Sequence, residues 1–376
     1  MPVPMAELPE AMQLVDDLVG DQAGIWDVAG AVPDMVIRTL GAAGLLCPLV
    51  PTAFGGIGAD SLWAGRFTAH LGSRCSSLRS VLTSQTMAAG MIERLGDEDQ
   101  RRKHLSALCG GTLAAAAFSE PEAGSDLSAV TTRIRDEGTK VVVTGHKSWT
   151  TAACYADLLI VVGRTDDGAG AAVVVPVDTS GVTVQPVADP SGCRAAGHAN
   201  LVFDEVILPA DALLGGGGQP LSLLVTAALG YGRMSVAWGC VGILRACKAA
   251  AAQHARRREQ FGVPLVEHQL VARHLAELLI AEQTATQACE HASRCLDAGS
   301  PDHVVATVLA KHVGATGAAR GAAAAMQVLG SAGAQDGHVV ARAYRDAKLM
   351  ELIEGTNEIC QLILARHVAG TAQEDR

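Results

Sequence analysis

The spacing of apolar positions changes twice along the chain. From about residue 5 to 110 they recur at helical intervals, broken by prolines and glycines between 48 and 58. From about 112 to 215 they gather into short runs rich in β-branched residues, and from 221 to about 368 the helical spacing returns. The pattern predicts helices, then strands, then helices.

Each apolar run of the middle region has the length of one strand. Gly, Asp, Pro and Ser separate the runs, and no helix-length pattern lies between them. Strands without intervening helices favour an antiparallel barrel or a sandwich over βαβ units. We expect strands over 140–145, 158–162, 172–177, 182–186 and 201–208.

The two outer regions have clear helix boundaries. Asp97 is placed to cap a helix over 98–108, and the glycines at 215–218 form a natural linker. Short breaks between the later helices suit antiparallel neighbours in a bundle. We therefore expect a mainly α protein with a β domain, divided into domains 1–111, 112–216 and 217–376. The long helices of the last domain are expected over 221–255, 269–296, 301–329, 339–353 and 356–368.

Composition narrows the class of protein. Charged residues are 18% and apolar residues 49% of the 376 positions, as in a globular chain, and the net charge of -10 argues against a nucleic-acid partner. The ten cysteines lack the spacing of a metal site, which favours free thiols in a reducing compartment. We expect no membrane span and, because the N-terminus lacks the features of a signal peptide, a cytoplasmic protein.

A polar loop follows the apolar run that ends at Ala117. Residues 118–126 read Phe-Ser-Glu-Pro-Glu-Ala-Gly-Ser-Asp. This segment has little apolar surface to bury, whereas its hydroxyl and backbone N–H groups suit a ligand. An ordinary capped turn has the same composition, so the loop alone leaves both interpretations open.

Trp149 is a second candidate, because only four tryptophans occur in the chain. Thr150 and Thr151 follow it directly. An exposed tryptophan beside hydroxyls offers a flat apolar face and hydrogen-bond donors, which are what the edge of a flavin ring requires. The alternative is core packing among the strands.

Glu354 is the candidate for proton transfer. It follows the apolar Leu352 and Ile353 and precedes a Gly355-Thr356 break. Partial burial there would raise the pKa of the carboxyl toward that of a general base. Gly355 would allow a ligand close to the backbone, and Thr356 would cap the next helix. The alternative is an ordinary carboxylate at a helix end.

Two further stretches occur in the last region. The first is a basic cluster, Arg256–Arg258, which lies close in sequence to Phe261, His268 and Gln269. Its guanidinium groups could bind a diphosphate, or they could simply be the cations that favour a helix C-terminus. The small residues within 327–333 either let a nucleotide approach or terminate a helix. The chain has no GxxxxGK, no GxSxG and no GxGxxG after a strand, which excludes a P-loop, an α/β-hydrolase and a Rossmann fold.

Together these motifs resemble the acyl-CoA dehydrogenase family over roughly residues 10 to 368. The family's N-terminal helical domain, middle antiparallel β-barrel and C-terminal four-helix bundle match the order predicted above. The ordered motifs are Phe54-Gly55-Gly56, 118–126, Trp149–Thr151, Arg233, 258–261, His268-Gln269, 327–330 and 353–356.

The resemblance implies non-covalent FAD between the β domain and the C-terminal helices. Glu354 matches the family's catalytic base. The positions that match the family's thioester contacts are Ser125, Arg233 and Gly355. The positions that match its flavin contacts within one subunit are Phe118, Ser119, Gly124, Ser125, Trp149, Thr151, Phe261, Thr356 and Glu358. In the family, some residues contact the FAD of a neighbouring subunit, which implies a dimeric or tetrameric homo-oligomer. The matching positions here are Arg258, His268, Gln269, Gln327, Val328, Gly330 and Ser331.

The implied reaction is oxidation of an acyl thioester. Glu354 would remove the α-proton, FAD would accept a hydride, and an electron-transferring flavoprotein or another acceptor would take the electrons. Four positions depart from the family. Ala116 replaces an aromatic residue, Gly230 replaces an Asp that helps hold the CoA arm, and Glu259 and Glu358 replace basic or amide residues.

A narrower resemblance concerns the tether of the substrate. Residues 75–80, 191–198 and 235–240 resemble a branch that acts on acyl-carrier-protein substrates in hydroxymalonyl or methoxymalonyl extender-unit synthesis. This resemblance implies oxidation of a short hydroxyacyl unit at a C3 hydroxyl or aldehyde. The alternatives are a conventional CoA-linked dehydrogenase that introduces an α,β double bond, a flavin monooxygenase, and a catalytically silent scaffold.

Overall fold

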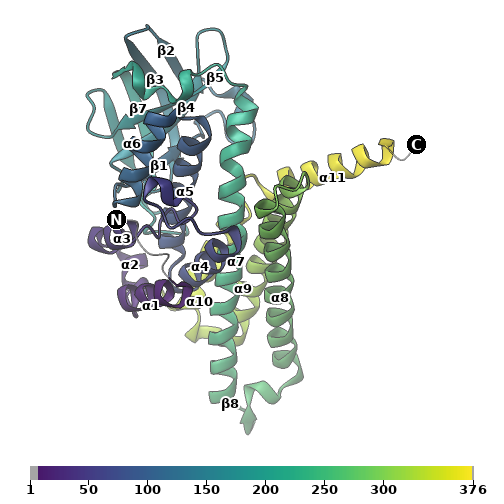
Figure 1. The fold of residues 1–376 in the computed structure, drawn as a ribbon. Helices are drawn as coiled ribbons and strands as arrows, with labels where there is room; N and C mark the ends of the chain where they lie inside the picture. The colour runs from purple at the N-terminus through teal and green to yellow at the C-terminus, as the bar shows by residue number, and fades with distance from the viewer. Residues whose placement is uncertain (1–6, 375–376) are drawn as a thin grey trace.

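The computed structural model describes residues 7–374, and its elements confirm the predicted fold class of helices, a β domain and helices (Figure 1). Asp97 caps α6 as expected, since its carboxylate accepts from the Gln100 N–H at 2.8 Å. The Gln100 side chain returns the bond to the Asp97 N–H at 2.9 Å and completes a capping box. The N-terminal helices are α1 (Leu8–Val19), α2 (Ala23–Ala29), α3 (Asp34–Ala42), α4 (Ser61–Arg74), α5 (Ser76–Leu95) and α6 (Glu98–Cys109).

The β domain is one sheet with the strand order β1-β4-β2-β3-β7-β6, and β5 pairs with β4. Most pairs are antiparallel as predicted, but β4 runs parallel to both β1 and β2, with Leu158 opposite Ala114 and Arg164 opposite Arg133. The β2–β3 hairpin lies between β1 and β4 along the chain, so their connection is long enough for a parallel pair. The strands are β1 (Ala114–Ala117), β2 (Arg133–Asp136), β3 (Lys140–Thr150), β4 (Leu158–Arg164), β5 (Gly170–Pro176), β6 (Val182–Pro186) and β7 (Ala199–Pro209).

Helix α7 (Leu221–Arg257) is the central element of the C-terminal region. Its 37 residues extend over roughly 55 Å and pack against α4 and α5 as well as α8, α9 and α10. The remaining elements are β8 (Glu259–Gln260), β9 (Val263–Pro264), α8 (Gln269–Asp297), α9 (His303–Leu329), α10 (Val339–Met350) and α11 (Asn357–Glu374).

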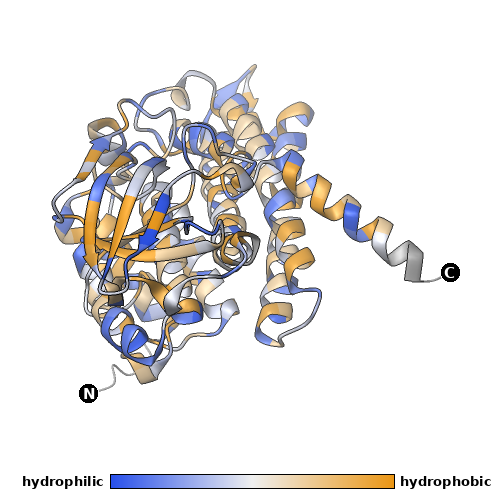
Figure 2. Cartoon of the chain, turned by 90° about the horizontal axis from the view of Figure 1, so that it is seen from above, coloured by the Kyte–Doolittle hydropathy of each residue, from blue (hydrophilic) through white to orange (hydrophobic). Residues whose placement is uncertain are grey.

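Apolar packing fixes α7 in place. Trp238 is almost fully buried, and its Nε1 donates to the Ser293 hydroxyl of α8 at 3.1 Å. Among the described residues, Leu224–Arg257 has the length and hydropathy of a membrane span, but 72% of that apolar window is buried inside the protein. It is therefore a core helix here. Helix α11, by contrast, projects from the body of the molecule (Figure 2).

Candidate active site

A cavity of about 430 Å³ lies where the ends of β1 and β3 meet α5, α7 and the connection between α10 and α11. It brings together residues that are far apart in the sequence. Those predicted from the β domain that line it are Phe118, Ser119, Gly124, Ser125, Trp149 and Thr151. Those predicted from the helical region are Arg233, Glu354, Gly355 and Thr356.

The loop after β1 is held by a buried ion pair. Lys147 Nζ donates to Glu120 Oε1 at 2.7 Å and to the Phe118 carbonyl at 2.9 Å. Burial alone would raise the pKa of Glu120, but hydrogen bonds from Lys147 and Thr132 outweigh it and lower the pKa to about 2. Glu120 thus stays ionised, and its role is to position the loop that carries Ser119 and Ser125.

Trp149 faces the cavity from a strained position at the end of β3. Its φ is 54°, a left-handed conformation that bulky residues rarely adopt, and its N–H donates to Asn200 Oδ1 at 3.1 Å. The β3–β7 register shifts between Lys147 and Thr150. The side chain is 55% exposed, so core packing does not account for this residue.

Two cations hold the backbone around Glu354. Arg233 Nε donates to the Glu354 carbonyl at 3.1 Å, and Lys311 Nζ donates to the Gly355 carbonyl at 2.7 Å. Glu354 and Gly355 have φ values of 55° and 90°, which turn the chain sharply between α10 and α11. Thr356 then accepts from the Ile359 N–H at 3.3 Å and caps α11, as expected.

The Glu354 carboxylate is itself unpaired. Its Oε2 is buried without a hydrogen-bond partner and lies against α7, where a Cβ added at Gly232 would be 2.2 Å from it. Burial raises the pKa of Glu354 to about 7, although Arg233 and Lys311 favour its ionised form. A carboxyl that titrates near neutral pH and has a free oxygen is suited to accept a proton from a ligand.

The cavity is also lined by residues without a predicted role, among them Arg79, Ser84 and His198. The Ser84 hydroxyl donates to the Thr151 carbonyl at 2.8 Å. His198 Nδ1 lies 3.2 Å from Thr151 Oγ1, and its buried Nε2 has no partner. Burial, helped by the charge of Arg79, lowers the pKa of His198 to about 4, so this imidazole is neutral at pH 7. Arg79 and His198 belong to the stretches 75–80 and 191–198 of the narrower resemblance. That resemblance is the feature of the sequence that could have marked them as site residues.

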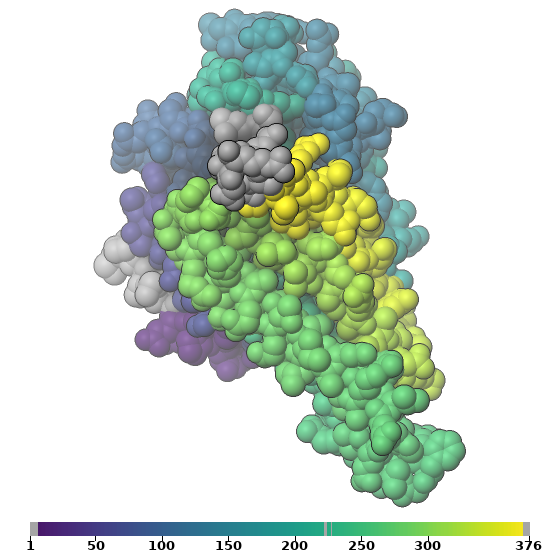
Figure 3. All heavy atoms as spheres, turned by 90° about the vertical axis from the view of Figure 1, so that its right-hand side faces the viewer, coloured from purple at the N-terminus to yellow at the C-terminus, as the bar shows by residue number. Residues whose placement is uncertain are grey.

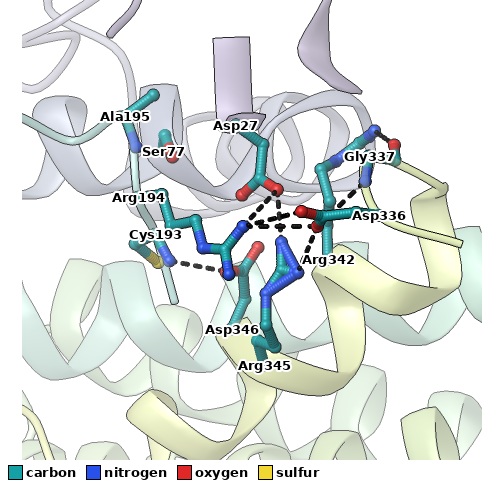
Figure 4. A network of polar contacts seen from close by, with 10 residues as sticks. All are labelled: Asp27, Ser77, Cys193, Arg194, Ala195, Asp336, Gly337, Arg342, Arg345 and Asp346. Carbon is teal, nitrogen blue, oxygen red and sulfur yellow. Dashed lines mark hydrogen bonds and ion pairs between the residues drawn. The ribbon is translucent and has the colours of Figure 1, made fainter. Parts of the chain in front are cut away.

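A polar network joins the loop that carries His198 to α10 (Figure 4). The Cys193 N–H donates to Asp346 Oδ1 at 2.6 Å, while Arg194 and Arg345 both contact Asp336, at 3.2 and 3.3 Å. Arg345 also pairs with the buried Asp27 of α2. The network ties the His198 loop to the helix that leads into Glu354.

The other predicted cofactor residues do not line the cavity. Arg258, Phe261, His268 and Gln269 lie around β8 and β9, at the opposite end of α7 from the sheet, and this tip protrudes in Figure 3. Phe261 is 94% exposed, and its ring lies 6.0 Å from that of His268. Gln327, Val328, Gly330 and Ser331 lie where α9 ends. Glu358 is an exposed residue in the first turn of α11.

The cavity residues fit a flavin. The exposed indole of Trp149 offers a flat apolar face, and the unpaired Nε2 of His198 is a buried polar atom that lacks a partner within the protein. Hydroxyls of Ser119, Ser125 and Thr151 lie around the same space. An apolar face with a few convergent polar groups is what a planar heterocycle requires.

Three family models cover most of the chain. The N-terminal domain of acyl-CoA dehydrogenase matches residues 8–112, the middle domain 115–206 and the C-terminal domain 223–369.

Relatives and solved structures agree with these matches. The probable acyl-CoA dehydrogenase YngJ of Bacillus subtilis is 32% identical over 96% of this chain and 99% of its own. A structure described as FkbI, for biosynthesis of the methoxymalonyl extender unit of the FK520 polyketide, is 59% identical, with a TM-score of 0.92 over 96% of this chain and 99% of its own. A glutaryl-CoA dehydrogenase of Mycobacterium smegmatis in complex with FADH2 is 25% identical, with a TM-score of 0.90 over 97% and 95% of the two chains.

Proposed function

The chain belongs to the acyl-CoA dehydrogenase family, and we propose that it oxidises a short hydroxyacyl unit carried as a thioester on an acyl carrier protein. Membership makes the protein an FAD-dependent oxidoreductase that acts on acyl thioesters. The observation that carries the proposal is the Glu354 carboxylate in the cavity between the β domain and the helices, because its buried Oε2 has no hydrogen-bond partner.

Each residue then has a proposed task. Glu354 Oε2 removes the α-proton of the thioester, and Arg233 and Lys311 hold the turn that aims this oxygen into the cavity. The backbone N–H of Glu354 hydrogen-bonds the thioester carbonyl and stabilises the negative charge that develops there. Bound FAD supplies the hydride acceptor. Trp149, Thr151, Phe118, Ser119, Gly124, Ser125 and Thr356 are proposed to hold its ring.

Two observations favour a carrier-protein tether over CoA. The FkbI structure, from methoxymalonyl extender-unit biosynthesis, is 59% identical to this chain. In addition, Gly230 of α7 leaves open space where the family commonly has an Asp that helps hold CoA, since a Cβ there would meet nothing within 4 Å. A conventional acyl-CoA dehydrogenase is the second candidate, because YngJ and the mitochondrial short-chain enzyme of Homo sapiens are both named acyl-CoA dehydrogenases.

We further propose a homo-oligomer in which the tip around Phe261 and the end of α9 contact the FAD of a neighbouring subunit. The strong exposure of Phe261 supports such a contact. An electron-transferring flavoprotein is the proposed electron acceptor. The cytoplasm is the proposed location, because all ten cysteines are free thiols.

The test is anaerobic titration of the FAD-loaded protein with one three-carbon hydroxyacyl group, attached either to a carrier protein or to CoA. We expect the carrier form to bleach the flavin absorbance and the CoA form to do so far more slowly. Equal bleaching would favour the conventional dehydrogenase, and no bleaching by either form would contradict the proposal. Oxygen consumption coupled to hydroxylation would identify a monooxygenase, and failure to bind FAD would identify a scaffold.

A further inference from the structure

Cys47 and Cys109 form a pair of buried thiols in the N-terminal helical region. Their Sγ atoms lie 3.9 Å apart, although the two residues are 62 positions apart in the sequence. All ten cysteines lie within the described residues 7–374, and this is the one pair whose sulfur atoms are in contact. Neither residue lines the active-site cavity, so the proposed function gives the pair no task.

Both thiols lie where the backbone can adjust. Cys47 belongs to the turns between α3 and α4, and Cys109 is the last residue of α6. Gly110 and Gly111 follow Cys109, and Gly111 has a φ of 104°. A disulfide has an S–S distance of about 2.05 Å, so the two sulfurs would have to approach by about 2 Å. A helix end and a connecting turn can shift by that amount more readily than two helix interiors.

Helix α5 holds both segments that carry the thiols. Thr86 Oγ1 donates to the Leu46 carbonyl at 3.1 Å, next to Cys47. Gln85 Nε2 donates to the Thr112 carbonyl at 2.9 Å, three residues after Cys109. Because one helix anchors both segments, the sulfurs stay next to each other in the folded protein, which favours a reaction between them.

The two thiols differ in access and in acidity. Cys109 is 8% exposed, whereas Cys47 is 1% exposed. A hydrogen bond from the Cys47 thiol lowers the pKa of Cys109, while the same contact and burial raise the pKa of Cys47. The thiolate is the nucleophilic form of a cysteine, so Cys109 is the residue that an oxidant meets first.

We propose that Cys47 and Cys109 are a redox-active pair that hydrogen peroxide converts into a reversible disulfide. The Cys109 sulfur attacks one peroxide oxygen, and the O–O bond breaks. Cys109 becomes a sulfenic acid, and the other oxygen leaves as hydroxide, which takes the Cys109 proton and forms water.

The second step closes the disulfide. The Cys47 sulfur attacks the Cys109 sulfur, the S–S bond forms, and the S–O bond breaks. The departing oxygen takes the Cys47 proton and leaves as a second water. Two thiols thus lose two electrons and two protons, and one hydrogen peroxide becomes two waters. In a reducing compartment such a disulfide is transient rather than permanent.

The test uses the FAD-loaded full chain with reduced thiols, treated in native buffer with an excess of hydrogen peroxide. After an acid quench, free thiols are alkylated and linked peptides are identified by mass spectrometry. We expect a peptide pair joined through Cys47 and Cys109, two hydrogens lighter than the free peptides, that disappears with dithiothreitol. Alkylation of both residues after peroxide treatment, or links mainly to other cysteines, would overturn the inference. No substrate is turned over, so the result is independent of the proposed function.

Single variants separate the two steps. In Cys47→Ser, Cys109 should stop at the sulfenic acid, which dimedone labels. In Cys109→Ser, dimedone should not label Cys47. The matched control is Cys295→Ser, at a half-buried thiol of α8, which should keep the link between Cys47 and Cys109. Labelling of Cys47 in place of Cys109, or loss of the link in Cys295→Ser, would contradict the proposed reaction. If either variant of the pair does not fold, the linked peptide of the parent protein decides.

Discussion

At the scale of single residues, the surroundings of two carboxyl groups, those of Glu120 and Glu354, shift their pKa values in opposite directions. Glu120 receives hydrogen bonds from Lys147 and Thr132, and its pKa falls to about 2. Glu354 is half-buried, its buried Oε2 has no hydrogen-bond partner, and desolvation raises its pKa to about 7. Only Glu354 can exchange a proton near neutral pH, which is the property that a catalytic base requires.

The raised pKa of Glu354 predicts a pH dependence. The base must be ionised, so kcat/KM should rise as pH increases through about 7 and level off above it. The stability effect has the opposite sign. A pKa that is higher in the folded state means that stability from this group is greatest below its unfolded pKa and is lost as pH rises through 7. Glu354→Gln should therefore gain stability over the parent protein above pH 7, measured by thermal unfolding at several pH values.

The Glu120–Lys147 pair predicts a large stability effect. Glu120→Gln leaves the Lys147 ammonium buried without a counter-charge and should cost about 3–5 kcal/mol of unfolding free energy. Urea denaturation measures the difference. The matched control is Glu122→Gln in the same loop, which is exposed and should change stability by less than about 0.5 kcal/mol. Equal effects of the two variants would contradict a structural role for the pair.

The sequence predicted Glu354 as the candidate base, because the ordered set of motifs implied that role and its apolar neighbours indicated burial. It assigned no role to Arg79 or His198. Each has an unpaired buried nitrogen in the folded protein, a property that arises from contacts between α5, α10 and the loop before β7. Spacing along one segment does not reveal such a property.

At the scale of elements, α7 positions the Glu354 carboxylate by leaving room for it. A Cβ at Gly232 would lie 2.2 Å from Oε2, whereas a Cβ at Gly230 would meet nothing within 4 Å. Gly232→Ala should therefore displace the carboxylate and slow flavin reduction at least tenfold, by analogy with small misplacements of other catalytic groups. Gly230→Ala is the matched control, with near-parental rates and up to about 1 kcal/mol of added stability. Stopped-flow absorbance measures both, and equal rates would contradict this packing.

The strands and long helices were predictable where apolar periodicity is strong. All five expected strands are present, and β6 has the predicted bounds, 182–186. Strands β1 and β2 were not predicted, because each has four residues and β1 consists of alanine alone. Helix α10 ends at Met350 rather than at the expected Ile353, since the chain turns there to reach the left-handed Glu354.

At the scale of the whole molecule, the exposed tip at the far end of α7 predicts an assembly. Phe261→Ser should shift the protein toward monomers and weaken FAD retention, because 94% of this residue is exposed in the single chain and the proposed oligomer covers it. Light scattering after size-exclusion chromatography measures the mass, and flavin absorbance measures the FAD content. Met35→Ser, at a residue of α3 that is 73% exposed, is the control and should change neither. A Phe261→Ser protein with unchanged mass and FAD content would refute the tip contact.

The most direct test of the central claim is a single-turnover measurement of flavin reduction in Glu354→Gln under anaerobic conditions. With the carrier-bound hydroxyacyl substrate, the variant should bind FAD as the parent protein does and reduce it at least about 10³-fold more slowly, as expected when a general base is lost. Flavin reduction at the parental rate would contradict Glu354 as the base.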